Sequence, residues 1–202
     1  MLKNFMNDRC YVIAEIGGNF TTFEEAKKLV SLARDAGVDA VKLQTYRADT
    51  IVTKTAIFDL DNVGQILQSE LFKKYEIDFE LHQKVFKYIE QIGLDWFSTP
   101  SHKTDVDMLE KLNVPAYKLG ADDATNIPLI KYTASKNKPM LLSSGYCTLQ
   151  EIRDMVDVCL QVGNDKIVLF HTVSNYPTYP EQVNLNVIQM LKKEFPYIKN
   201  FF

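Results

Sequence analysis

The chain has 202 residues, with 23 Lys and Arg against 26 Asp and Glu, so its formal net charge is −3. A composition of 46% hydrophobic and 24% charged residues is typical of a globular protein with a core of its own. The mild acidity disfavours nucleic acid or an anionic membrane as the main partner, and no apolar run approaches the roughly 18 residues of a membrane span. The three widely spaced cysteines form no CxxC pair, which predicts a reducing, cytoplasmic setting.

Short apolar runs alternate in the first half with longer segments of helical periodicity. The predicted strands are residues 11–15, 38–45 and 94–99. One helix is expected after the capping box of Thr22 and Glu25, a second over residues 81–92, and a third from Thr104. Gly37 and Gly93 stand where the first two helices should end. Residues 46–76 are less regular and are expected to form a long excursion between strand and helix.

The second half continues the alternation, with predicted strands at residues 115–120, 139–143 and 166–171. Helices are expected from Asn126, from a second capping box at Thr148, and around residues 187–191. Repeated βα units predict a parallel sheet, either open and doubly wound or closed as a barrel. The segment Gly17-Gly18-Asn19 lacks the GxGxxG pattern of a doubly wound dinucleotide fold. We therefore expect an α/β protein of the (β/α)₈ TIM-barrel type, incomplete, with about six βα units in one partial barrel over residues 1–202.

Polar or ionisable residues occur at or just after the carboxyl end of every predicted strand. They are Glu15, Lys42, Gln44, Ser98, Thr99, Lys118, Ser143, Ser144, His171, Ser174 and Tyr176. Strand alternation puts Lys42 and Gln44 on the face opposite Val41. A lysine within a strand is costly to desolvate unless it is paired or used, and active sites of (β/α)₈ barrels lie at this end of the strands.

Each of these residues also has a structural interpretation. Glu15 could be paired with a lysine, Lys118 could be the partner of Asp122, and His171 could be a hydrogen-bonded core histidine. Thr99 and Ser143 could simply cap turns. The functional interpretation is that two inward lysines, small hydroxyls and a Ser-Gly turn bind a small phosphorylated anion, while the carboxylate handles a proton or orients a second substrate.

Six short motifs occur in order along residues 11–185. They are Ala14-Glu-Ile-Gly17, Val41-Lys-Leu-Gln-Thr45, Phe97-Ser-Thr-Pro100, Ala116-Tyr-Lys-Leu-Gly120, Leu142-Ser-Ser-Gly145 and His171-Thr-Val-Ser-Asn-Tyr-Pro-Thr178. Together they closely resemble the catalytic barrel of bacterial N-acetylneuraminate (sialic acid) synthases. Relatives in that family make legionaminic acid, pseudaminic acid and spore-coat sugars.

The resemblance implies condensation of phosphoenolpyruvate with an open-chain N-acetylhexosamine, such as N-acetylmannosamine, to give a nine-carbon 2-keto acid and phosphate. It also implies a Mn²⁺ or Mg²⁺ ion that polarises the sugar aldehyde, and a homodimer. By motif, one group of residues would hold phosphoenolpyruvate: Lys118, Thr99, Ser143 and Ser174, with Lys42 adding charge. Glu15, Gln44 and Tyr176 would face the sugar or the reacting carbons, so the candidate catalytic residues are Glu15, Lys42 and Lys118.

The sequence departs from the family pattern in two places. Ala121 stands where many members have a phosphate-binding serine. The family's two metal-binding histidines and its antifreeze-like C-terminal domain belong to later segments, so we expect no metal ligands in residues 1–202. With six strands, we further expect unpaired edges at residues 11–15 and 167–171, marginal stability and self-association.

Whether this chain is itself an enzyme is therefore an open question. One alternative is an inactive remnant that at most binds phosphoenolpyruvate or a partner. Another is a barrel aldolase that uses Lys118 or Lys42 as a Schiff-base nucleophile.

Overall fold

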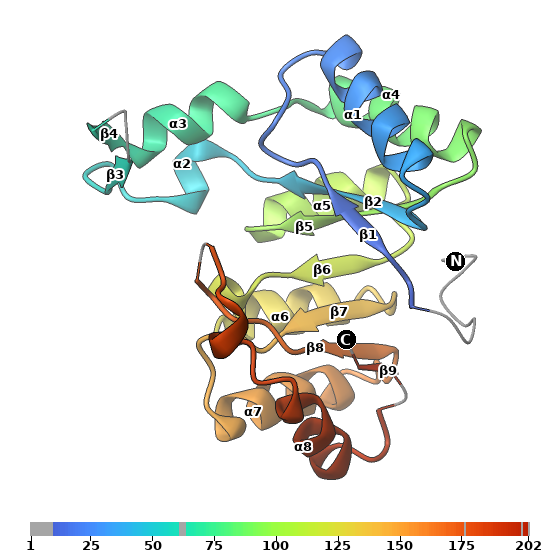
Figure 1. Cartoon of the computed structure of the whole chain (residues 1–202), viewed down its shortest axis with the longest axis vertical. Helices are drawn as coiled ribbons and strands as arrows, with labels where there is room; N and C mark the ends of the chain where they lie inside the picture. The colour runs from blue at the N-terminus through green and yellow to red at the C-terminus, as the bar shows by residue number, and fades with distance from the viewer. Residues whose placement is uncertain (1–9, 61–63, 176, 199, 202) are drawn as a thin grey trace. The chain divides into compact units, whose positions relative to one another are not determined.

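The computed structural model describes residues 10–60, 64–175, 177–198 and 200–201. The chain divides into two compact units, an N-terminal unit up to Pro115 and a C-terminal unit from Ala116 onward. Figure 1 shows helices and strands alternating along the chain in both units. Among the described residues, none of the helices has the length and apolar character needed to cross a membrane.

The N-terminal unit contains a parallel sheet with the strand order β1-β2-β5. Its strands and main helices are β1 (Ile13–Glu15), α1 (Phe23–Asp35), β2 (Ala40–Thr45), α4 (Phe79–Gln91), β5 (Asp95–Pro100) and α5 (Lys103–Lys111). Val41 and Leu43 of β2 are fully buried, whereas Lys42 and Gln44, which alternate with them, are only partly buried. The predicted alternation of the two faces is thus confirmed.

The excursion between β2 and α4 has secondary structure that the sequence pattern did not predict. It comprises α2 (Ala48–Ile51), the strands β3 (Ile57–Leu60) and β4 (Gly64–Leu67), and α3 (Gln68–Tyr75). The two strands pair antiparallel, and α3 buries none of its residues completely. The ring of Phe72 lies 5.2 Å from that of Tyr46 and 6.0 Å from that of Phe58, measured between centroids. A small aromatic cluster therefore holds this excursion together.

The C-terminal unit contains a parallel sheet with the strand order β6-β7-β8-β9. Its strands and helices are β6 (Tyr117–Leu119), α6 (Ile127–Ala134), β7 (Met140–Ser143), α7 (Leu149–Gln161), β8 (Ile167–Phe170), α8 (Asn186–Glu194) and β9 (Asn200–Phe201), with short 3₁₀ turns at η1 (Ala121–Asp123) and η2 (Pro180–Gln182). β9 pairs with β8 at Val168 and Leu169. The expectation of a wholly unpaired edge at residues 167–171 is therefore wrong, because the final residues supply a further short strand.

The helix ends follow the capping signals in the sequence. Thr22 and Thr148 both form complete capping boxes, in which the threonine hydroxyl accepts a backbone N–H and the glutamate three residues later accepts the N–H of the threonine. α5 starts one residue earlier than expected, because the imidazole of His102 accepts the N–H of Thr104 and serves as the N-cap. Well-formed caps fix where each helix begins relative to the strand end before it.

Candidate functional site

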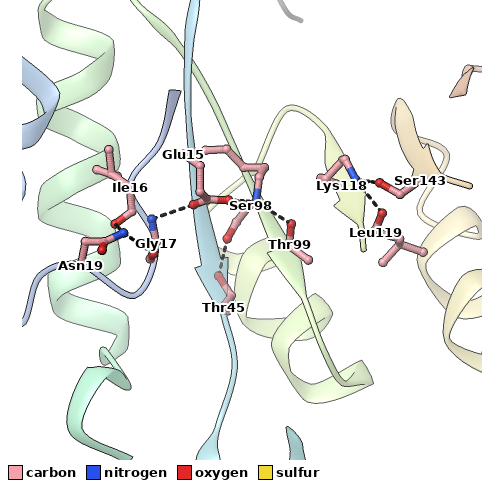
Figure 2. Close-up of polar contacts among 11 residues, drawn as sticks. Glu15, Ile16, Gly17, Asn19, Thr45, Ser98, Thr99, Lys118, Leu119 and Ser143 are labelled. Carbon is pink, nitrogen blue, oxygen red and sulfur yellow. Dashed lines mark hydrogen bonds and ion pairs between the residues drawn. The ribbon is translucent and has the colours of Figure 1, made fainter. Parts of the chain in front are cut away.

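The N-terminal unit brings together Glu15, Gly17, Lys42 and Thr99, which we call the Glu15 cluster. Figure 2 labels Glu15, Gly17 and Thr99. Glu15 and Lys42 lie opposite each other in the β1–β2 register, and their side chains form an ion pair. The Lys42 ammonium also donates to Thr99 Oγ1 at 3.2 Å. The Lys42 side chain is only 15% exposed, against 37% for Glu15, so the ammonium is the more enclosed member of the pair. Glu15 is thus the ion-pair partner of a lysine, and its catalytic role stays a prediction.

The backbone of Gly17 fixes the position of the Glu15 carboxylate. The Gly17 N–H donates to Glu15 Oε1 at 2.7 Å. A Cβ at residue 17 would lie 2.6 Å from the backbone nitrogen of Gln44 and 2.8 Å from Glu15 Oε1, far inside normal contact. Only glycine fits here, because the turn after β1 approaches β2 so closely. The side-chain amide of Asn19 closes the turn by donating to the Gly17 carbonyl at 2.9 Å.

A buried polar network lies in the same unit, at the ends of β2 and β5. The Thr45 hydroxyl contacts Ser98 Oγ at 2.7 Å and His82 Nε2 at 2.9 Å, and all three residues are buried. His82 Nδ1 lies 2.8 Å from the Asp78 carbonyl, which can only accept, so Nδ1 carries the hydrogen and Nε2 accepts from Thr45. Burial lowers the pKa of His82 and keeps the ring neutral. The sequence interpretation missed this anchor between β2 and α4, although a histidine on the apolar face of a helix was the available signal.

The C-terminal unit brings together Lys118, Ser143 and Phe170, which we call the Lys118 cluster (Figure 2 shows Lys118 and Ser143). The Lys118 ammonium donates to Ser143 Oγ and to the carbonyl of Leu119, the latter at 2.8 Å. It also lies 5.2 Å from the centre of the Phe170 ring, within range of a cation–π contact. Burial lowers the pKa of Lys118 to about 8, and the carboxylate of Asp122 opposes that shift only in part. This lysine is therefore solvated mainly by neutral groups.

The Ser144–Gly145 turn after β7 adjoins the loops that follow β6 and β8. The Gly145 N–H donates to Thr172 Oγ1 at 2.8 Å, and the Ser144 N–H donates to the Phe170 carbonyl at 3.0 Å. A Cβ at residue 145 would lie 3.0 Å from the Cβ of Ala121 and closer still to Ser174 Oγ. Ser174 and Ala121 thus both lie close to Gly145, just after the strand that ends with Ser143.

The other predicted site residues have different outcomes. Gln44 lies against Gly17, whose missing side chain makes room for it. His171 Nε2 lies 2.6 Å from the Val183 carbonyl, in line with a structural role for that ring. Tyr176 lies outside the described residues. Convergence of Lys42 and Lys118 on one ligand stays a prediction.

A metal centre would need a group of ligating side chains at one place in the described residues. Protein sites for Mn²⁺ or Mg²⁺ combine several carboxylate or imidazole groups. Across residues 10–60, 64–175, 177–198 and 200–201, the structure groups no three His, Cys, Asp or Glu side chains in that way. This part of the chain does not fit a resident metal.

Similarity to solved structures identifies the fold. The crystal structure of the N-acetylneuraminic acid (sialic acid) synthetase of Leptospira borgpetersenii in complex with citrate superimposes with a TM-score of 0.82 at 24% identity, over 93% of this chain and 62% of that chain. The chain is an α/β protein of the (β/α)₈ barrel type that contains about six of the eight βα units.

Similarity to curated sequences identifies the family. The chain is 37% identical over 195 residues to the N,N'-diacetyllegionaminic acid synthase of Legionella pneumophila, covering 92% of this chain and 55% of that protein. It is 31% identical over 196 residues to the N-acetylneuraminate-9-phosphate synthase of Drosophila melanogaster, covering 95% of this chain and 52% of that protein. The chain thus spans about half the length of the curated relatives it matches. The model of the NeuB family matches residues 29–200, and the chain accordingly belongs to the NeuB family.

Proposed function

We propose that this chain supplies the phosphoenolpyruvate-binding part of a nonulosonic acid synthase, which condenses phosphoenolpyruvate with an N-acetylated amino sugar and releases phosphate. The observation that carries the proposal is the setting of Lys118. Its side chain is partly buried, and its ammonium is hydrogen bonded to two neutral acceptors, Ser143 Oγ and the Leu119 carbonyl. A cation in such a setting gains most from an anionic ligand, since the ligand supplies the missing negative charge.

In this proposal the Lys118 cluster binds the phosphate or carboxylate of phosphoenolpyruvate. Lys118 provides the charge, while the hydroxyls of Ser143 and Ser174 provide donors. The resemblance also assigns Thr99 and Lys42 to phosphoenolpyruvate, and we retain that assignment as part of the proposal. The names of the relatives, synthases of legionaminic acid and of N-acetylneuraminate 9-phosphate, support a sugar acid of this class as the product.

The proposed reaction forms one C–C bond and breaks one C–O bond. C3 of phosphoenolpyruvate attacks the aldehyde carbon of the open-chain sugar, and water adds at C2. Phosphate then leaves as the bond between C2 and the phosphate oxygen breaks. Glu15, held as a carboxylate by Lys42 and by the Gly17 N–H, is suited to accept a proton from that water or to orient the sugar. Gln44 and Tyr176 are proposed to contact the sugar.

Two measurements on the 202-residue chain test the proposal. Calorimetric titration with phosphoenolpyruvate should show saturable binding. Because the described residues group no metal ligands, we expect no phosphate release by this chain alone when manganese and N-acetylmannosamine are added. Steady phosphate release would contradict that expectation and would show that the chain turns over by itself. Absence of binding would overturn the proposal.

The lowered pKa of Lys118 also favours a second candidate, a Schiff-base aldolase. A neutral lysine amine can attack a ketone and lose water to form an imine, and a pKa near 8 leaves a useful fraction of the amine neutral. Borohydride reduction in the presence of pyruvate separates the two candidates. A covalent mass increase located on Lys118 would support the aldolase, whereas the synthase proposal expects none.

Two further expectations belong to the proposal. The described cysteines Cys10, Cys147 and Cys159 are all free, which supports a reducing, cytoplasmic location. Self-association, implied by the resemblance to homodimeric synthases, is checked by light scattering across a range of chain concentrations.

A further inference from the structure

We propose that Tyr146 is a positioning residue that holds Ser174 at the Lys118 cluster. Tyr146 follows the Ser144–Gly145 turn and lies 79% exposed. Its hydroxyl donates to the backbone carbonyl of Ser174 at 2.9 Å. This inference rests on the proposed function, because Ser174 is taken to contact the anion.

The backbone of Tyr146 is in a conformation that a tyrosine seldom adopts. Its φ of 62° lies in the left-handed region, where a bulky side chain is strained. Packing does not offset this strain, because most of the ring remains in solvent. What the conformation does provide is the reach of the phenol hydroxyl to Ser174.

That hydrogen bond ties together two loops that bear site residues. The turn after β7 follows Ser143, the partner of Lys118, and the loop after β8 contains Ser174. The same two loops are joined at Gly145, whose N–H donates to Thr172 Oγ1. With both ties in place, Ser174 Oγ packs against the Gly145 backbone. Tyr146 therefore acts through Ser174 and has no need to contact the ligand.

The test compares Tyr146→Phe with Tyr197→Phe, a matched loss of a hydroxyl from a tyrosine that is 54% exposed in the same unit. Loss of one net hydrogen bond predicts about fivefold weaker binding of phosphoenolpyruvate by Y146F and no change for Y197F. The Ser174→Ala chain retains the carbonyl that Tyr146 binds but lacks the hydroxyl that it positions. Y146F should therefore have no further effect in that background. A merely structural role would weaken binding equally in both backgrounds and would overturn the inference.

A measurement without phosphoenolpyruvate tests the role of Tyr146 independently of the proposed function. Hydrogen exchange at the Gly145 amide, which is bonded to Thr172, should speed up in Y146F and stay unchanged in Y197F. If exchange does not change, the positioning role is wrong whatever the ligand. If exchange speeds up but the unsubstituted chain does not bind phosphoenolpyruvate, the loop tie is real and the proposed function is what fails.

Discussion

The two units each place a lysine near the end of a strand, yet they treat its charge differently. In the Glu15 cluster the ammonium of Lys42 is neutralised by a carboxylate. In the Lys118 cluster the ammonium is surrounded by a hydroxyl, a carbonyl and an aromatic ring, and burial lowers its pKa to about 8. A cation already paired with a carboxylate has little attraction left for an anion, whereas one solvated by neutral groups retains most of it. We therefore infer that Lys118 contributes most of the anion binding. The Glu15 cluster mainly handles a proton, and Lys42 and Thr99 add a smaller share to the binding of phosphoenolpyruvate.

The largest expected effect comes from replacing Lys118 with methionine, which keeps the length of the side chain and removes its charge. Hydrogen bonds to charged groups contribute about 1.5–3 kcal/mol, so phosphoenolpyruvate should bind roughly 100-fold more weakly in calorimetric titration. Thermal stability should not fall, since the substitution removes a desolvated ammonium. The matched control is Lys131→Met on the exposed face of α6, which should bind like the unsubstituted chain. An equal loss of affinity in Lys118→Met and Lys131→Met would show that Lys118 has no special part in binding the anion.

The next largest effect is expected on the free energy of unfolding, when a glycine in each unit is replaced by alanine. In Gly17→Ala the new methyl group meets the rigid backbone nitrogen of Gln44, which should cost about 2 kcal/mol of unfolding free energy. In Gly145→Ala it meets the hydroxyls of Thr172 and Ser174, which can rotate away, so the cost should be smaller. Urea denaturation of both variants measures the difference. A larger loss in Gly145→Ala would show that the turn after β7 is the more rigid of the two.

The pH dependence of binding should be smaller again, about tenfold between pH 7 and pH 9. The anion binds the protonated form of Lys118, which is depleted as the pH rises through about 8. Folding stability should change in the opposite direction. Because the pKa of Lys118 is lower in the folded chain than its ordinary value of 10.5, the unfolded chain holds more protons between pH 8 and 10.5, and stability from this group rises across that window. Lys118→Met should abolish the pH dependence of binding and that of stability. If either persists in this variant, another titratable group causes it.

The smallest expected effect on phosphoenolpyruvate affinity is that of Glu15→Gln. The substitution breaks the ion pair with Lys42 and should lower the unfolding free energy by about 1 kcal/mol, a modest loss because the carboxylate is partly in solvent. Affinity for phosphoenolpyruvate should stay within about threefold of the unsubstituted chain. A loss as large as that expected for Lys118→Met would contradict the division of tasks. Thermal melts and titrations on the same samples give both quantities.

Much of the fold could be predicted because it depends on local signals. The capping boxes at Thr22 and Thr148 and the two-residue alternation around Lys42 state where helices begin and which side chains face inward. The hairpin of β3 and β4 was missed because each strand has only four residues, too few for a clear pattern. A small aromatic cluster around Phe72 stabilises that excursion. β9 was missed because a two-residue strand has too few residues for a pattern.

The candidate site was predicted in its residues but not in its pairings. The sequence places Glu15, Lys42 and Lys118 at strand ends, yet it cannot tell which lysine the carboxylate neutralises, because that depends on strand register. The role of Tyr146 had no signal at all. A positive φ is common at asparagine, as at Asn113 and Asn137, but a tyrosine in that conformation depends on a tertiary hydrogen bond.

The most direct test of the account is the titration of the lysine side chains by carbon-13 NMR, assigned with Lys118→Met and Lys42→Met. The account predicts that Lys118 titrates near pH 8 in the ligand-free chain and that saturating phosphoenolpyruvate moves its pKa upward, because the anion stabilises the charged ammonium. An ordinary pKa for Lys118, unmoved by phosphoenolpyruvate, would contradict the claim that this lysine binds the anion.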